Sequence, residues 1–109
     1  MAQITRNQFR AKWLASTHKE TAAYVSHFED LCRLLNHATP TDIDPKGSFF
    51  CYQRANLKES GQLGFADVWY DQHFGWEYVG KRGDLDAKYK QLLQYRDNLA
   101  NPPLLVVCD

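Results

Sequence analysis

The stretch that decides the fold is FADVWYDQHFGWEYVGKRGDLDA, residues 65–87, in which two aromatic-rich segments flank the polar pair Asp71-Gln72. Residues 65–70 and 73–79 alternate in polarity and are joined near Asp71, a pattern that predicts a β-hairpin. Asp84 follows at a position where it can cap a helix. The stretch therefore predicts two antiparallel strands that lead into a helix.

Each strand of this hairpin carries one carboxylate, Asp67 on the first and Glu77 on the second. Because side chains alternate between the faces of a strand, Asp67 shares a face with Trp69, and Glu77 shares one with Val79. The turn then directs both carboxylates to the same side, roughly 5–8 Å apart. Like charges at this distance repel, and Mg²⁺ is a usual partner for such a pair. The spacing alone fits a metal site or two ordinary solvent-facing residues.

Two helices are expected before the hairpin. The first covers residues 5–14, and the second begins at Thr17, where Thr17 and Glu20 can form a capping box. The apolar stripe of the second helix consists of Tyr24, Phe28, Leu31 and Leu35. Residues 38–48 and 56–64 read as loops on either side of a strand at 49–53.

The helix capped by Asp84 is followed by Leu104–Val107, an apolar run expected to form a strand buried on both faces. The side chains near the buried side of that helix are Leu85, Tyr89, Leu92, Tyr95 (or Arg96) and Leu99. The predicted order is α-α-β-β-β-α-β, a mixed α/β fold with a mixed sheet, a hairpin and a crossover helix. One domain spans residues 1–109.

Composition narrows the class of protein. Thirteen basic and thirteen acidic residues give a net charge of zero, so the whole chain offers no electrostatic attraction to nucleic acid. Three widely spaced cysteines, with no Cys-x-x-Cys pair, favour a reducing cytoplasm over a disulfide scaffold or a zinc site. No signal peptide or membrane span is visible. Since the chain ends just after an apolar run, we expect it to be the N-terminal piece of a longer protein.

Several segments carry a resemblance to a known family. FADVW, WEYVGK, DLDA, QLLQY and NPPLLVV, together with FRAKW, HFEDLCRLL and TPTDIDP earlier in the chain, resemble the N-terminal nuclease domain of type IIL (MmeI-like) restriction-modification enzymes. In that family one polypeptide joins a PD-(D/E)xK-type endonuclease to an S-adenosylmethionine-dependent adenine methyltransferase and a target-recognition domain. The resemblance implies a restriction-endonuclease-like core, double-stranded DNA as substrate and a bacterial cytoplasmic location.

The resemblance also assigns roles to individual residues. Asp67 and Glu77 match the carboxylates that bind Mg²⁺, and Gln91 matches a glutamine that can contact the site, although an exposed helix glutamine is equally compatible. Lys81 matches a second lysine of the family's pattern, and Lys81 and Arg82 could meet DNA phosphates. A helix glutamate supports the metal in some related nucleases, and Glu29 could do so here or simply be exposed. Lys88 and Lys90 could also meet phosphates, but the interleaved aspartates favour a solvated helix face.

The sequence departs from the family at Val79, where the motif Glu-x-Lys has its lysine. That lysine positions the attacking water and offsets charge at the phosphate, and its loss should cost several kcal/mol of transition-state stabilisation. Lys81 has the same strand parity but starts about 6.6 Å further along the strand, so we do not expect it to compensate. An engineered knock-out and a natural loss of cleavage would both produce this sequence.

The leading hypothesis is a Mg²⁺-dependent endonuclease domain whose catalysis is impaired by Val79, with any S-adenosylmethionine site in a downstream domain. The alternative is a non-catalytic domain that contacts DNA or serves as a scaffold for an attached adenine-specific DNA methyltransferase. A third reading is a carbohydrate or peptide binder that uses exposed rings of Trp69, Trp76 and Tyr78.

Overall fold

The structure is a computed structural model that describes residues 3–18, 20–57, 63–80 and 84–108. Its elements in chain order are α1 (Arg6–Ala15), α2 (Glu20–Leu34), α3 (Pro40–Ile43), β1 (Phe50–Leu57), β2 (Leu63–Tyr70), β3 (Phe74–Tyr78), α4 (Leu85–Tyr95), the 3₁₀ helix η1 (Arg96–Leu99) and β4 (Leu104–Cys108). This order confirms the predicted mixed α/β class, with the short α3 added between α2 and the sheet.

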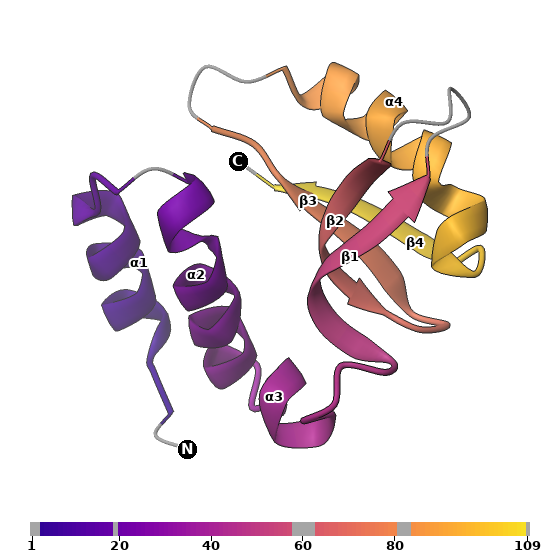
Figure 1. Cartoon of the computed structure of the whole chain (residues 1–109). Helices are drawn as coiled ribbons and strands as arrows, with labels where there is room; N and C mark the ends of the chain where they lie inside the picture. The colour runs from indigo at the N-terminus through magenta and orange to yellow at the C-terminus, as the bar shows by residue number, and fades with distance from the viewer. Residues whose placement is uncertain (1–2, 19, 58–62, 81–83, 109) are drawn as a thin grey trace.

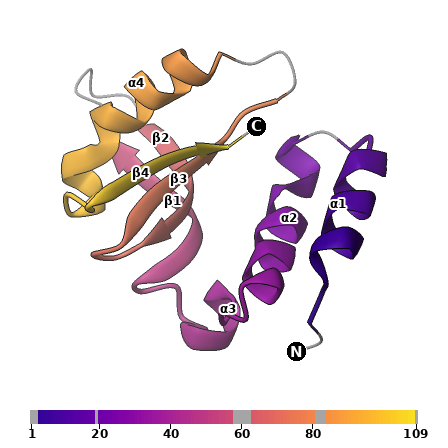
Figure 2. The ribbon, with the colours of Figure 1, turned by 180° about the vertical axis from the view of Figure 1, so that it is seen from behind.

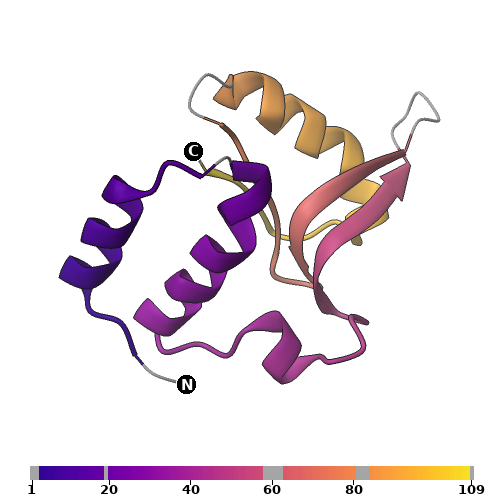
Figure 3. The ribbon, with the colours of Figure 1, turned by 60° about the vertical axis from the view of Figure 1, so that its left-hand side comes forward.

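The sheet has the strand order β1-β2-β3-β4, in which β1, β2 and β3 are antiparallel neighbours and β4 runs parallel to β3. Helix α4 is the crossover that joins β3 to β4. Helices α2 and α4 cover opposite faces of the sheet, and α1 lies on the far side of α2 (Figure 1). The same layers are seen from behind in Figure 2 and from the side in Figure 3. No helix within the described ranges is long and apolar enough to cross a membrane.

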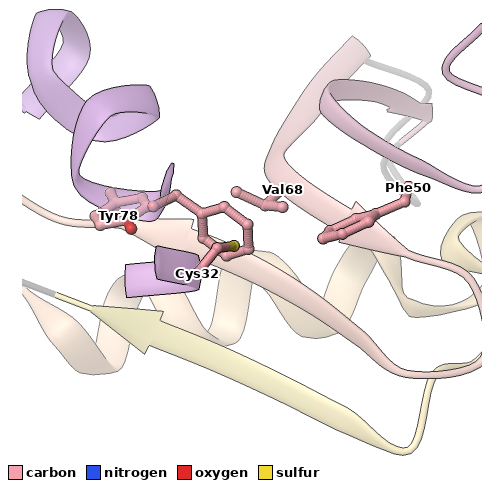
Figure 4. Close-up of a cluster of buried hydrophobic side chains, with 5 residues drawn as sticks. Cys32, Phe50, Val68 and Tyr78 are labelled. Carbon is pink, nitrogen blue, oxygen red and sulfur yellow. The ribbon is translucent and has the colours of Figure 1, made fainter. Parts of the chain in front are cut away.

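The face of the sheet under α2 holds an aromatic core. Phe28 and Cys32 of α2 pack on Phe50, Val68 and Tyr78 of the three antiparallel strands (Figure 4). All five side chains are buried, and burial raises the pKa of the Cys32 thiol to about 11. This cluster attaches the N-terminal helices to the hairpin.

The opposite face holds a second core beneath α4. Leu92, Tyr95 and Leu99 are fully buried against Ala66 and Trp69 of β2. The indole Nε1 of Trp69 donates to the Leu99 carbonyl oxygen at 2.9 Å, which ties β2 to η1. The C-terminal half of α4 and η1 are thereby fixed against the hairpin.

Gly75 of β3 allows this close approach. A Cβ at this position would lie 2.8 Å from Cδ1 of Leu99 and 3.4 Å from Cδ2 of Leu105. Since real Cβ atoms do not come within 2.8 Å of carbon, even an alanine would force the Leu99 side chain to shift.

Caps explain where two of the helices begin. The Thr5 hydroxyl accepts from the Gln8 amide while the Gln8 side chain accepts from the Thr5 amide, which forms a capping box at the start of α1. The predicted start of the next helix at Thr17 is wrong, because α2 begins at Glu20. Only four residues separate the end of α1 from α2, and Thr17 lies in the turn that connects them. Asp84 caps α4 as predicted, accepting from the amides of Asp86 and Ala87.

Several burial predictions need correction. Leu35 is 69% exposed, and Leu85 and Tyr89 are each 44% exposed, because α2 has ended before Leu35 and only the C-terminal half of α4 lies over the sheet. Leu104 is 61% exposed and the rest of β4 is half-buried, since within the described chain β4 pairs with β3 alone. The predicted loops also contain structure, with α3 inside 38–48 and strand ends at both sides of 56–64.

Polar contacts hold α1 on α2. Asp30, which is only 3% exposed, accepts from Lys12 Nζ and Arg33 Nη1 at 2.7 Å each and from Trp13 Nε1 at 3.1 Å. Burial works against the charged form, but these donors outweigh it and lower the pKa of Asp30. His27 lies between the helices and the sheet, with Nδ1 2.9 Å from the Tyr78 hydroxyl and its ring against Trp13.

Candidate functional site

The two predicted carboxylates lie at the end of the β2–β3 hairpin farther from its turn. The antiparallel ladder pairs Tyr70 with Phe74 and Val68 with Trp76, and it ends there, one residue short of both Asp67 and Glu77. We call Asp67, Glu77 and the side chains that contact them the carboxylate site. Both residues therefore lie on strands, just beyond the paired part of the β2–β3 ladder.

Asp67 is held by donors from both neighbouring strands. Its Oδ2 accepts from the backbone amide of Tyr78 at 2.8 Å, and its Oδ1 accepts from Nε2 of Gln53 at 3.1 Å. The same Gln53 amide donates to the hydroxyl of Tyr24 at 2.9 Å. The carboxylate therefore lies between the strands and is connected through Gln53 to α2.

The strand geometry around Asp67 is irregular. Gln53, the residue of β1 opposite Asp67, has a left-handed φ of 55°, which is uncommon for a residue with a Cβ. Ala66 packs in the same cluster as Trp69, three positions along β2, although strict alternation would place them on opposite faces. This break in alternation accompanies the turn of the Asp67 carboxylate toward β3.

Glu77 lies deeper than Asp67 and faces α4. It is 3% exposed, while Asp67 is half-buried. Its Oε2 lies 4.0 Å from Nζ of Lys88, whose side chain is 37% exposed. The predicted solvated face therefore does not describe Lys88, because its ammonium group forms an ion pair with a buried carboxylate.

Helix α4 places a second polar pair beside the carboxylates. Gln91, one turn after Lys88, donates from Nε2 to the hydroxyl of Tyr95 at 2.7 Å. Burial raises the pKa of Tyr95, and the negative charges of Glu77 and Asp67 raise it further, while the hydrogen bond with Gln91 opposes this. Both carboxylates thus act electrostatically on the residue that Gln91 contacts.

The charges of the two carboxylates also act on a tyrosine of α2, the helix that covers the other face of the sheet. Burial raises the pKa of Tyr24, and the charges of Asp67 and Glu77 add to this while the hydrogen bond with Gln53 opposes it. Tyr24 belongs to α2 and Tyr95 to α4, the helices that cover opposite faces of the sheet.

Val79, at the position where the resemblance predicts a lysine, is apolar and enclosed. Val79 is 3% exposed, and its amide donates to the Cys108 carbonyl oxygen of β4 at 2.7 Å. Its side chain can neither donate a hydrogen bond nor carry charge. The predicted DNA contacts Lys81 and Arg82 lie outside the described residues.

Asp67 and Glu77 carry the type of ligand atom that a hard cation takes. Mg²⁺ prefers oxygen ligands and keeps several of its own waters, so two carboxylates can be its whole protein ligand set. Each Asp67 oxygen accepts one hydrogen bond, which leaves lone pairs for a further partner. Within the part of the chain that the structure describes, no group of three or more His, Cys, Asp or Glu side chains could hold a metal ion.

The other predicted residues lie elsewhere. Glu29 accepts from the Tyr52 hydroxyl at 3.2 Å on the α2 side of the sheet. The reading that relied on exposed rings is wrong, because Trp69 and Tyr78 are 4% and 5% exposed and Trp76 is partly covered by Phe28.

Sequence reasoning missed Gln53 and the pairing of Lys88. The one available signal for Gln53 was a polar residue at the end of the apolar run FFCYQ. Comparison with protein-family models, with curated proteins and with solved structures finds no match for this chain.

Proposed function

We propose that this chain is the endonuclease domain of a bacterial restriction-modification enzyme that acts on double-stranded DNA in the cytoplasm. The observation that carries the proposal is that Asp67 and Glu77 lie on adjacent strands just beyond the paired part of their ladder, and that the crossover helix that follows carries Gln91. An antiparallel hairpin followed by a crossover helix and a parallel strand is compatible with a restriction-endonuclease-like core. Methylation, S-adenosylmethionine binding and target recognition would belong to other domains of the same polypeptide.

The proposed reaction is hydrolysis of a phosphodiester. The oxygen of a water molecule forms a bond to phosphorus, the bond from phosphorus to one ester oxygen breaks, and the proton of the water ends on the departing alcohol. Asp67 and Glu77 would hold Mg²⁺, which polarises the phosphate and lowers the pKa of the water when bound. Tyr78 and Gln53 orient the Asp67 carboxylate, and Lys81 and Arg82 are the proposed contacts to DNA phosphates.

Val79 limits this reaction. The residue that should donate to the attacking water and offset phosphate charge is a buried valine, so we propose that cleavage is impaired. A single well-placed electrostatic group contributes roughly 10²–10³-fold in rate in other enzymes.

Cleavage of supercoiled plasmid by the native chain and by a Val79→Lys variant tests the function. We expect the lysine variant to cut about 10²-fold faster in Mg²⁺, and a second change, Glu77→Gln, to abolish cutting. Val79→Met is the matched control, because it adds similar bulk without charge. Circular dichroism establishes that each variant is folded. A folded lysine variant that neither binds Mg²⁺ nor cuts DNA would contradict the assignment.

A second function is favoured by the same valine. A buried apolar residue at the lysine position also suits a non-catalytic domain that contacts DNA or supports an attached adenine-specific methyltransferase. In that case the Val79→Lys variant would remain inactive, while deletion of this domain from the full-length protein would weaken its binding to DNA.

A further inference from the structure

A basic side chain contacts the carboxylate site from α4. Nζ of Lys88 lies 4.0 Å from Oε2 of Glu77, and the two differ sharply in exposure, at 37% for the lysine side chain and 4% for the glutamate side chain. The ammonium group is thus at the boundary between the buried carboxylate and solvent. A phosphate that approaches Glu77 from solvent on this side would meet Lys88.

The position of Lys88 is set by the fold. Its backbone amide donates to the carbonyl oxygen of the capping residue Asp84 at 3.0 Å, which fixes it in the first turns of α4. The helix is held close to the hairpin farther along, where Leu92 and Leu99 pack over Gly75. The packing of Leu92 and Leu99 holds α4 against the hairpin, where Lys88 reaches Glu77.

The charge that Lys88 brings is the charge that position 79 lacks. Val79 is buried and apolar, whereas Lys88 already neutralises part of the negative charge of Glu77. Opposite charges about 4 Å apart attract appreciably even near a protein surface. Lys88 of α4 therefore places a positive charge next to Glu77, where Val79 of the neighbouring strand position supplies none.

We propose that Lys88 is a positioning residue of the carboxylate site, which orients Glu77 and supplies the positive charge that the strand position of Val79 does not. This proposal rests on the proposed nuclease function. It goes beyond that function because it places the charge on α4 and predicts residual cleavage in the native chain despite Val79.

Single-turnover nicking of supercoiled plasmid in Mn²⁺ tests this role in the complete chain. We expect slow nicking by the native chain, a loss of at least about tenfold in Lys88→Met, and activity close to native in Lys88→Arg. Lys90→Met is the matched control, because this exposed lysine lies on the same helix, and residues two apart on a helix do not share a face. Introducing Val79→Lys into the Lys88→Met chain should restore nicking, which a merely structural role of Lys88 would not explain.

The outcomes separate the two proposals. If native and Lys88→Met chains nick at the same rate, the role of Lys88 is overturned while the nuclease function stands. If the Val79→Lys variant nicks DNA and the native chain does not, the role of Lys88 is also overturned, and the nuclease function stands. If no variant nicks DNA and none binds Mn²⁺, the proposed nuclease function fails, and the role of Lys88 fails with it.

Discussion

At the scale of single residues, the approach of α4 to the hairpin depends on the absence of a side chain at Gly75. A Cβ there would lie 2.8 Å from Cδ1 of Leu99, which is too short for two carbon atoms, and Leu99 is fully buried with little room to move. The identity of this residue therefore limits how closely η1 and the end of α4 can pack on β3.

We expect Gly75→Ala to lower the free energy of unfolding by about 1–3 kcal/mol, the usual cost of overpacking a core. Urea denaturation measures the change. The control is Leu99→Ala, alone and combined with Gly75→Ala, because the smaller side chain leaves space for the added methyl group. The losses of unfolding free energy in the two single variants should sum to more than the loss in the double variant. Strictly additive losses would mean that the two residues do not compete for space.

Residue identities predicted part of the site. The alternation of residues 65–70 and 73–79 was enough to predict the hairpin, whereas the distance between the Asp67 and Glu77 carboxylates stays a prediction. The left-handed backbone of Gln53 was not predictable, because glutamine rarely adopts it and nothing local requires it. The pairing of Lys88 with Glu77 depends on how α4 packs, which is tertiary information absent from the helix sequence itself.

At the scale of elements, the junction of α1, α2 and β3 is centred on His27. Its ring packs against Phe9 and Trp13 of α1, and its Nδ1 contacts the hydroxyl of Tyr78. Burial lowers the pKa of His27 below its ordinary value of 6.5, and the nearby charge of Asp30 only partly opposes this.

The stability of the fold should therefore depend on pH through His27. Because its pKa is lower in the folded state, the unfolded chain binds more protons in the window just below pH 6.5, and stability falls as the pH falls through that window. We expect a loss of less than about 1 kcal/mol, since the ring is half-buried and solvent screens part of the effect. Urea denaturation at pH 7.5 and 5.5 measures it.

The matched control for this pH dependence is another histidine. His27→Phe should flatten the dependence between pH 7.5 and 5.5, whereas His18→Phe, which changes an exposed histidine, should leave it as in the native chain. An undiminished slope in His27→Phe would show that another group is responsible.

Helix boundaries and burial were the weaker predictions at this scale. The stripe that included Leu85 and Tyr89 followed from helical spacing, but spacing does not say how much of a helix lies over the sheet. The predicted start at Thr17 likewise differs from the observed start of α2 at Glu20, because residues 16–18 belong to the short connection between α1 and α2.

At the scale of the whole molecule, two cores on opposite faces of one sheet hold the carboxylate site between them. The cluster around Phe28 packs on one face of the antiparallel strands. The cluster around Leu92 and Tyr95 packs on the other face. The site lies where the β2–β3 ladder gives way to side-chain hydrogen bonds, so both layers contribute contacts to it. The net charge of zero fits the proposal that other domains supply most of the attraction to DNA.

The central claim is that Asp67 and Glu77 form a site for a divalent cation, and Mn²⁺ titration followed by amide NMR spectra tests it most directly. Paramagnetic broadening by Mn²⁺ should first remove the amide signals of Asp67, Glu77 and Tyr78, and Glu77→Gln should suppress this selective loss. Broadening that instead centres on exposed carboxylates such as Asp42, or that is unchanged in Glu77→Gln, would contradict the account.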